Sequence, residues 1–494
     1  MLAKEWTKKY FQALQEVKRN IGLCRMFITG LNTNIDGLRH VRGPEIEKIV
    51  NEEKLAEEVL HKLNNPPREI VTFPDVLAGI LYCAKTGDGE EWFIRDPRIT
   101  EMIKSVFGYD RLRMGGQCGI MTNVLALMNL KVIPNVVELP PLQAEQFITE
   151  GGEILIPRFE GEKIFFKKPL EAAREGDKVF IHWIFEFDNQ FKARINREIV
   201  EAPVENRFIA TYDDENIKLK TDPAFREGTL KVIHKVGKVI LSGYHMLQKS
   251  YPDGSKPEDH IRETLDLINS WREKNPEIRI HSEIGFLADP DLRKSVLDMV
   301  APNVDSLGLN EDELADNLHT LGQRDGLAEI KALEAPKIYT GARKILEKYH
   351  LSRIMVHTRE FSLSLTTPNY GIHPRDELYS IMFGSLFAAT LAHTGNFPTI
   401  QAAEKTLKSG ELKVSMRGMA EHQKLAELLE NEEGYPKQKF LEEGFAHTEP
   451  SVAFVPSKLT EPKATVGMGD TITSAAIAAE EALTCKAKNT KTIN

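Results

Sequence analysis

The second half of the chain alternates short apolar runs with longer amphipathic segments. Apolar runs of strand length occur at 239–244, 278–286, 305–309 and 353–358, and segments with helical spacing lie near 258–273, 290–300, 311–319 and 325–349. Strands that alternate with helices in this way are typical of a mostly parallel sheet covered on both faces. We therefore expect a large three-layer α/β/α domain in this half of the chain.

The first half of the chain has a different pattern. Apolar residues at helical spacing predict a helix over 4–20, followed by a strand over 24–31. Short β-rich runs separated by turn residues then occur at 131–139, 153–158, 163–167, 178–187 and 205–212. Short strands without intervening helices predict an inserted, β-rich lid domain. The expected large domain comprises residues 1–30, 112–150 and 210–494, and the expected lid comprises residues 31–111 and 151–209.

Composition narrows the class of protein. The 494 residues are 41% apolar and 28% charged, which is ordinary for a globular protein, and the net charge of -9 argues against a nucleic-acid binder. The four cysteines form no C-x-x-C pair, and the charged N-terminus lacks the apolar segment of a secretory signal. No apolar run has the length of a membrane span. We expect a cytoplasmic protein, monomeric or weakly homo-oligomeric, that acts on small molecules.

A glycine-rich stretch near the C-terminus carries the first candidate chemistry. Gly467-Met468-Gly469-Asp470 lies between an apolar strand over 452–456 and a segment of strong helix formers from Ser474. Glycines allow close backbone approach, and the unpaired N–H groups at a helix start can receive an anion. Asp470 could then take a proton from a substrate hydroxyl. The alternative is a plain helix start with Asp470 as its N-cap.

Two stretches in the first half place polar groups beside predicted element ends. Asn34 and Asp36 follow the strand over 24–31, where alternating side chains point to one side and could meet a polyol. An Asx-type turn is the alternative. Gly116 and Gln117 open a predicted helix, where the glycine permits close approach and the amide offers a donor and an acceptor. A tight interhelix turn would explain the same residues.

Two further clusters lie at strand ends of the predicted large domain. His281 and Glu283 are two apart on a strand, so they face the same way, as a ligand site or as a mutually satisfied pair. Asn310 ends a strand with Glu313 three residues later, which is also the spacing of a capping box. Together with Gly-x-Gly-Asp, these residues offer carboxylates for hydrated Mg²⁺, an anion hole and a base, the parts that phosphoryl transfer needs.

The ordered set of motifs resembles a known family. Asn310-x-x-Glu313 and Gly467-Met468-Gly469-Asp470 are similar to the ribokinase-like superfamily. His281-x-Glu283, Gly115-Gly116-Gln117 and Asn32-x-Asn34-x-Asp36 resemble its ADP-dependent sugar kinase branch. The resemblance covers nearly the whole chain. It implies a ribokinase-like large domain, a small lid, and transfer of the β-phosphate of ADP to a sugar with release of AMP.

The same resemblance implies a role for each site residue. Asp470 would be the base, with the backbone of Gly467, Met468 and Gly469 as the anion hole and Arg207 facing phosphate. The residues expected to meet the sugar are Asn34, Asp36, Gly116, Gln117 and His182. Those expected on the Mg²⁺ side are Glu283, Asn310 and Glu313. Those expected on the nucleotide side are His357, Val455 and Ser457, although His357 could equally be a buried structural histidine.

The identity of the sugar depends on two lid residues. Glu91 lies where the resemblance places a glucose-binding glutamate, although Glu90 leaves the register open by one residue, and Lys168 lies where phosphofructokinases bind a sugar phosphate. Both could instead be solvated surface residues. We expect an enzyme that phosphorylates fructose 6-phosphate and also accepts glucose. The alternatives are a glucose-specific kinase, an ATP-using kinase of the same superfamily, and a non-catalytic sensor.

Overall fold

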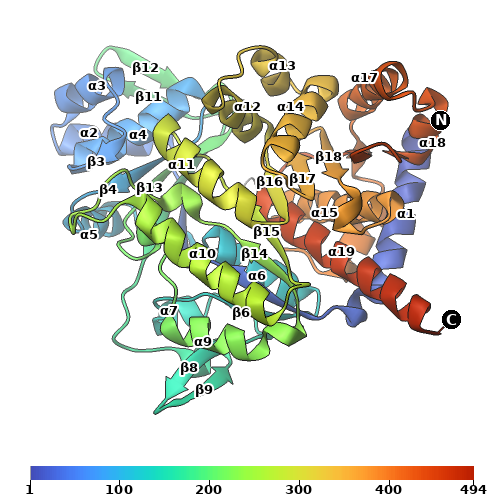
Figure 1. The fold of residues 1–494 in the computed structure, drawn as a ribbon. Coiled ribbons are helices and arrows are strands. Elements are labelled where there is room, and N and C mark those ends of the chain that lie inside the picture. Colours follow the sequence, from blue (N-terminus) through green and yellow to red (C-terminus); the bar gives the residue numbers. More distant parts are fainter. Residues whose placement is uncertain (1, 465, 494) are drawn as a thin grey trace.

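The computed structural model describes residues 2–464 and 466–493 and contains two large sheets (Figure 1). The larger sheet is parallel through its central strands, with three antiparallel strands at one edge. Its strands, in spatial order, are β20 (Phe445–Ala446), β21 (Ser451–Pro456), β18 (Phe361–Thr366), β17 (Arg353–His357), β16 (Ser306–Leu309), β15 (Arg279–Glu283), β14 (Val236–Leu241), β1 (Met26–Gly30), β6 (Lys131–Pro134) and β7 (Glu153–Ile154).

Helices cover both faces of the larger sheet because alternate strand residues are apolar. Phe27, Ile240 and Met355 point into one core, and their neighbours Ile28 and Val239 point into the other. The first core is closed by α1 (Leu2–Asn20), α6 (Gln117–Leu127), α15 (Pro374–Thr394), α16 (Ile400–Ser409) and α19 (Met468–Ile493). The second is closed by α9 (Pro223–Val232), α10 (Pro257–Lys274), α11 (Pro290–Val300), α12 (Glu311–Thr320), α13 (Leu327–Lys331), α14 (Ala335–Lys348), α17 (Met416–Glu433) and α18 (Lys437–Glu443). The predicted three-layer α/β/α domain is confirmed.

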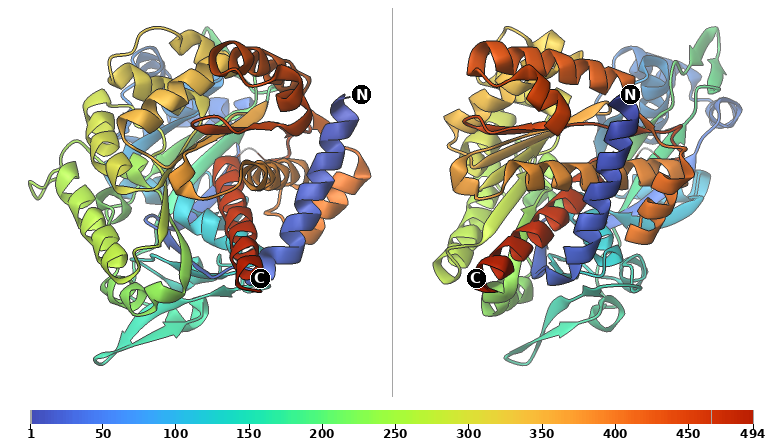
Figure 2. Two further views of the ribbon diagram at one scale, coloured as in Figure 1. Left: turned by 45° about the vertical axis from the view of Figure 1, so that its right-hand side comes forward. Right: turned by 90° about the vertical axis from the view of Figure 1, so that its right-hand side faces the viewer.

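The two ends of the chain belong to this domain. Helices α1 and α19 lie side by side although they are far apart in sequence (Figure 2). Trp6, Tyr10 and Leu14 of α1 are fully buried in the core that α19 also closes. The N-terminal helix predicted over 4–20 is therefore part of the large domain.

The smaller sheet forms the β-rich domain at the upper left of Figure 1. In spatial order its strands are β3 (Glu69–Ile70), β4 (Glu90–Ile94), β13 (Asn206–Thr211), β10 (Ile181–Phe187), β2 (Asn34–His40) and β5 (Arg111–Gly115). One face packs on α2 (Gly43–Glu52), α3 (Ala56–Asn64), α4 (Phe73–Thr86) and α5 (Arg98–Val106), through Trp92, Trp183, Phe185 and Phe208. A hairpin of β11 (Lys192–Ile195) and β12 (Glu198–Glu201) adjoins this core.

Strand pairing changes one expected domain boundary. We expected residues 151–209 to belong wholly to the lid, but β7 pairs with β6 in the larger sheet. The next hairpin, β8 (Ile156–Glu160) with β9 (Lys163–Lys167), packs against α9 of the large domain and lies at the bottom of Figure 1. The short elements α7 (Pro141–Ala144) and α8 (Pro169–Ala172) lie beside it, and β19 (Lys413–Val414) pairs with β22 (Lys458–Leu459) elsewhere.

Candidate functional site

The glycine-rich stretch forms the start of α19. The helix begins at Met468, so Asp470 is its third residue and is not an N-cap, and the helix starts earlier than the expected Ser474. Its first hydrogen bond runs from the Thr471 N–H to the Gly467 carbonyl, at 3.0 Å. The three N–H groups before Thr471 therefore point out of the helix end. Gly467 has φ +81°, a conformation that favours glycine.

Asp470 is half-buried in this first turn. Burial raises the pKa of the Asp470 carboxyl to about 7, and the negative charge of Glu283 adds to the effect, while His357 and Arg113 oppose it. A carboxyl with a pKa near neutrality is suited to accept a proton from a hydroxyl group. Gly469 leaves room for this arrangement, because a Cβ there would lie 3.4 Å from His357 Cε1.

Glu283 ends β15 next to this helix start. Its Oε1 accepts hydrogen bonds from His281 Nε2 at 3.0 Å and from Thr473 Oγ1 of α19 at 2.7 Å, and its Oε2 lies 4.0 Å from His357 Nε2. Burial alone would raise the pKa of Glu283, but the hydrogen bond from His281 and the proximity of His357 hold it well below its usual range. His281 and Glu283 thus form the mutually satisfied pair that was one of the two alternatives.

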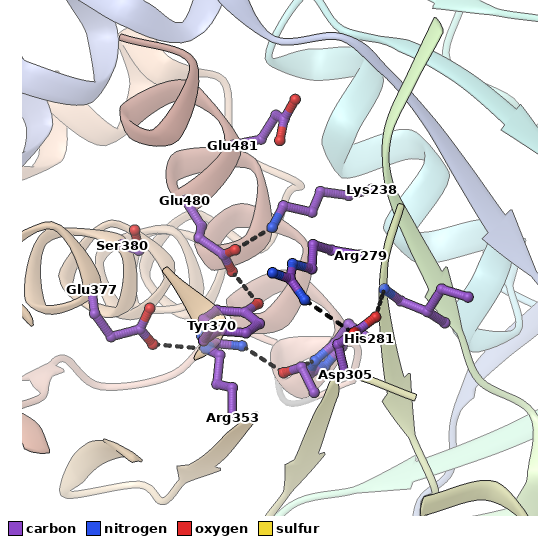
Figure 3. Close-up of polar contacts among 12 residues, drawn as sticks. Lys238, Arg279, His281, Asp305, Arg353, Tyr370, Glu377, Ser380, Glu480 and Glu481 are labelled. Carbon is purple, nitrogen blue, oxygen red and sulfur yellow. Dashed lines mark hydrogen bonds and ion pairs between the residues drawn. The ribbon is translucent and has the colours of Figure 1, made fainter. Parts of the chain in front are cut away.

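A buried polar network stands behind His281 (Figure 3). Arg353 of β17 donates from Nη1 to Ser306 Oγ at 3.1 Å, and Ser306 lies 2.8 Å from His281 Nδ1. Because an arginine only donates, the Ser306 hydroxyl is left to donate to His281 Nδ1, so that the Nε2 of His281 carries the proton for Glu283. The Arg353 Nε donates to Glu377 of α15 at 2.8 Å. The orientation of Glu283 therefore depends on a chain of groups inside the large domain.

Asn310 and Glu313 form a capping box at the start of α12. Asn310 Oδ1 accepts from the Glu313 N–H at 2.8 Å, and Glu313 Oε2 accepts from the Asn310 N–H at 2.9 Å. Burial raises the pKa of Glu313 to about 7, and the nearby Glu283 charge adds to this. In the described part of the chain, no group of three or more His, Cys, Asp or Glu side chains is placed to hold a metal ion.

The small sheet has a second face, which does not pack on α2 to α5. This face is polar and lies toward the start of α19. Side chains alternate along strands, so the apolar residues point to the helices and the polar ones to the opposite face. Cross-strand pairing places Arg113, Asp36, His182 and Thr211 in one row. Glu91 lies on the same face, where Thr211 Oγ1 donates to its Oε1 at 2.6 Å.

On this face His182 is buried and Arg207 is half-buried. Burial disfavours charge on His182, but Asp213 at 3.3 Å, Glu91 and Asp36 raise its pKa overall. Burial lowers the pKa of the Arg207 guanidinium, partly offset by Glu186. The structure therefore brings the predicted residues of the lid onto one face, with Asp36 contributing to the electrostatic environment of Asp470.

Gly116 and Gln117 join the small sheet to α6. Gly116 has φ +72°, and a Cβ there would lie 2.6 Å from the Asn32 carbonyl oxygen. Gln117 Oε1 accepts from the Gly243 N–H at 2.9 Å, which ties this turn to the loop after β14. At Gly115 a Cβ would overlap the Asp36 carboxylate. These glycines allow the backbone to pack against the polar side chains, and Gln117 keeps its amide N–H groups for other partners.

Several buried polar atoms around this face have no hydrogen-bond partner among the described residues. They are Asn32 Oδ1, Asn34 Oδ1, Arg113 Nε and Nη2, Arg207 Nε and His245 Nδ1. Buried polar atoms are nearly always satisfied, so a concentration of unsatisfied ones indicates a ligand site. Sequence analysis missed Arg113 and His245. The alternation of Arg113 with Gly115 along one strand was the available signal for the arginine.

Three predicted residues are not joined to this cluster by contacts of the described residues. Val455 is fully buried in the large-domain core. The backbone of Ser457 bonds to Glu360 and Ser415, at 2.9 Å each. Lys168 is exposed between β9 and α8. Their roles toward nucleotide and sugar phosphate stay predictions.

The structure combines a three-layer α/β/α domain with a smaller sheet whose polar face lies opposite a glycine-rich helix start that carries Asp470, an arrangement suited to a kinase. A family model described as "ADP-specific Phosphofructokinase/Glucokinase conserved region" matches residues 25–479. The chain belongs to this family, so the predicted family, fold class and enzymatic nature are confirmed. No helix in the described ranges has both the length and the apolarity to cross a membrane.

Individual relatives cover the chain almost completely. The ADP-specific phosphofructokinase of Methanosarcina acetivorans is 31% identical over 96% of this chain and 97% of its own length. The ADP-dependent glucose/glucosamine kinase of Pyrococcus abyssi is 32% identical over 97% and 99%. A solved ADP-dependent kinase in complex with fructose-6-phosphate and ADPβS is 28% identical, with TM-score 0.81 over 97% and 98%. This chain is thus similar to kinases named for two different sugars.

Proposed function

We propose that this protein transfers the β-phosphate of ADP to fructose 6-phosphate, giving fructose 1,6-bisphosphate and AMP, and that it also accepts glucose. The observation that carries the proposal is the group of unpartnered polar atoms on the small-sheet face opposite Gly467–Asp470. A sugar has hydroxyl groups that can donate to Asn32 and Asn34 and accept from arginine. Relatives named for phosphofructokinase and for glucose/glucosamine kinase activity are equally similar, which supports a site for both sugars.

In the proposed chemical step, Asp470 accepts a proton and the start of α19 binds the transferred phosphoryl group. The acceptor hydroxyl oxygen forms a bond to the β-phosphorus of ADP, and the bond from that phosphorus to the oxygen bridging it to the α-phosphorus breaks. AMP leaves with the electron pair, and the hydroxyl proton passes to the Asp470 carboxylate. The N–H groups at the start of α19 receive the negative charge of the phosphoryl oxygens.

The residues present fit a hydrated Mg²⁺ ion. Glu283 and Glu313 lie close enough that the charge of Glu283 raises the pKa of Glu313, which marks a region of negative potential. Magnesium keeps most of its waters and needs few protein carboxylates, so two such groups suffice. When bound there, the ion would neutralise phosphate charge. Glu283 and Glu313 would orient its waters, and Asn310 would hold Glu313 through the capping box.

The alternative is an enzyme specific for glucose. Glu91 favours it, because its carboxylate is held on the polar face by Thr211 and faces His182 at 3.9 Å, while Glu90 accepts from Trp92 Nε1 on the opposite face. Lys168, the residue expected to bind a sugar phosphate, is exposed and makes no contact with this face among the described residues. The two proposals differ in one measurable ratio, the turnover of fructose 6-phosphate over that of glucose.

The test is an assay of AMP formation from ADP with each sugar in parallel, with ATP as a control donor. We expect turnover of both sugars with ADP, and turnover of glucose alone would establish the alternative. In Asp470→Asn we expect kcat to fall by about 10³-fold, because the base is lost. Since burial raises the pKa of Asp470, its charge at pH 8 destabilises the fold, and the variant should melt no lower than the parent. Full activity in that variant would refute the mechanism.

A further inference from the structure

Arg113 is a half-buried arginine of the small sheet whose guanidinium is only partly paired. It lies on β5 opposite Asp36, with Nε 3.5 Å from Asp36 Oδ2, and its side chain is 11% exposed. That separation is too long for a charge-assisted hydrogen bond, which is usually 2.7–2.9 Å. Both Nε and Nη2 of Arg113 lack a hydrogen-bond partner in the described chain. An unpaired buried guanidinium is costly, so a partner supplied by a ligand is expected.

Phe397 connects this guanidinium to the start of α19. The Arg113 Cζ atom lies 5.8 Å from the centre of the Phe397 ring, within the range of a cation–π contact. Phe397 comes from the loop between α15 and α16 of the large domain, and a Cβ built on Gly467 would lie 3.5 Å from its ring. The aromatic ring therefore touches both the lid arginine and the glycine-rich turn, and it holds the guanidinium next to the proposed anion hole.

The charges around Arg113 support the same placement. Its positive charge lowers the raised pKa of Asp470 and also lowers the pKa of Arg207. Arg113 therefore lies close enough to Asp470 and to Arg207 for its charge to act on both. Two guanidinium groups that repel each other with open N–H donors are typical of a site that receives a phosphate group.

We propose that Arg113 is a catalytic residue that donates from Nε and Nη2 to the phosphoryl group during its transfer, opposite the N–H groups of the α19 start. This inference rests on the proposed function. As the acceptor oxygen binds the β-phosphorus and AMP departs, negative charge spreads over the three remaining phosphoryl oxygens. A fixed guanidinium that stabilises this charge more than that of the ground state lowers the barrier.

The first test compares Arg113→Met with Arg111→Met. Methionine keeps much of the apolar stem, and Arg111 is an exposed arginine on the same strand that serves as a matched control. We expect Arg113→Met to lower kcat and kcat/KM together by about 10²- to 10³-fold, as expected for a contact made in the transition state. The dissociation constant of glucose, measured by calorimetry, should change by less than about threefold. Arg111→Met should retain parental kinetics.

A second test uses chemical rescue. In Arg113→Ala, added guanidinium ion should restore part of kcat, whereas sodium at the same ionic strength should not, because only the planar donor replaces the lost group. Arg113→Lys keeps the charge without the fork and should lose at least about tenfold in kcat if the geometry matters. This conservative variant also keeps the proposal testable should the larger truncations fail to fold.

The outcomes separate this inference from the proposed function. A kcat within about threefold of the parent in Arg113→Met, or a raised glucose KM with unchanged kcat, would overturn the role of Arg113 while leaving an inactive Asp470→Asn to support the function. If the parent enzyme formed no AMP from ADP with either sugar, the proposed function itself would be refuted. A loss in Arg113→Ala that guanidinium does not rescue, together with full activity in Arg113→Lys, would assign Arg113 to charge balance with Asp36 and overturn the contact proposed here.

Discussion

Two polar clusters, one on the small-sheet face and one inside the large domain, differ in how their atoms are paired. On the small-sheet face, buried atoms of Asn34, Arg113 and Arg207 have no partner in the described chain. In the cluster inside the large domain, the two buried cations contact carboxylates: Lys238 pairs with Glu480, and Arg353 pairs with Glu377 (Figure 3). Glu377 Oε2 is the one atom of these pairs without a partner among the described residues.

Tyr370 shows how closely the inner cluster is integrated. Its hydroxyl donates to Glu480 at 2.9 Å, and its ring lies under the charges of Lys238 and Arg353, at 5.4 and 5.9 Å from the ring centre. Burial opposes ionisation of Glu480, yet Lys238 and Arg353 hold its pKa below the usual value. The carboxylate is thus stabilised by the fold itself and needs no ligand.

This difference distinguishes polar groups that stabilise the fold from polar groups that are available to a ligand. A buried donor or acceptor without a partner costs about 1–3 kcal/mol, so a fold that retains several of them in one place gains something else from them. A paired cluster has already recovered much of that cost within the protein. Burial of charge by itself therefore does not identify the site, whereas a concentration of unpartnered polar atoms on one face points to it.

The largest expected effect that tests this comparison is on stability. Lys238→Met would leave the Glu480 carboxylate buried without its lysine, which typically costs about 3–5 kcal/mol in the free energy of unfolding. Urea unfolding followed by circular dichroism would measure the loss. We expect kcat/KM below the unfolding range to stay within about twofold of the parent.

The control for this variant is the double substitution Lys238→Met with Glu480→Gln. Glutamine carries no charge and still accepts the Tyr370 hydrogen bond, so most of the lost stability should return. If Lys238→Met lowered turnover sharply and left stability unchanged, the inner cluster would belong to the site and the comparison would fail.

A smaller effect is expected from pH on Asp470, which lies at the start of α19 opposite the small-sheet face. Because burial raises the pKa of Asp470 to about 7, the base is protonated below that pH and kcat/KM should fall about tenfold per pH unit. Glucose is the suitable acceptor, because it has no group that titrates in this range. The assay would use saturating ADP and Mg²⁺ between pH 5.5 and 8.5.

As a control, enzyme is held at each pH and then assayed at pH 8. Full activity at pH 8 would exclude irreversible inactivation. Asp470 gains a proton in the folded state between its ordinary pKa and about 7, so its contribution to stability decreases as pH rises through that window. The fall in rate at low pH should therefore occur without unfolding caused by Asp470. A flat profile would contradict its role as base.

The periodicity of apolar residues was sufficient to predict the layers of the large domain. It was not sufficient to predict where the lid domain begins and ends. Strands such as 353–357 are apolar on both faces because helices cover both, and this pattern is visible in the sequence. The two-residue strand β7 carries too little pattern to show which sheet it joins. Its pairing with β6 depends on contacts that local sequence does not encode.

The residues of the candidate site also fall into two groups, those that sequence spacing could identify and those that depend on the fold. Asp470 and Glu283 could be selected because glycines or a histidine accompany them at fixed spacing. The choice between Glu90 and Glu91 depends on strand register, which became clear only when Trp92 and Thr211 were placed. The relation of Arg113 to Phe397, nearly three hundred positions apart, could not be predicted from spacing.

The smallest expected effect concerns Ser306, which joins Arg353 of the inner cluster to His281 and, through it, to Glu283. The sequence shows His281 and Glu283 as a pair, but the serine and Arg353 behind them come from other strands. Ser306→Ala removes the hydroxyl that orients His281 and leaves no new buried charge. We expect about 1 kcal/mol less stability and a fall in kcat of about five- to tenfold, with glucose KM unchanged.

Ser364→Ala is the matched control, since Ser364 is a fully buried serine of β18, two strands away in the same sheet, and its hydroxyl has no partner among the described residues. Its loss should change neither kcat nor stability by more than about 0.5 kcal/mol, because no hydrogen bond is broken. Equal effects of the two substitutions would show that Ser306 only fills space. A loss of kcat confined to Ser306→Ala would show that the hydrogen bond of Ser306 matters for turnover. Ser306 would then link the paired network of the large domain to the orientation of Glu283.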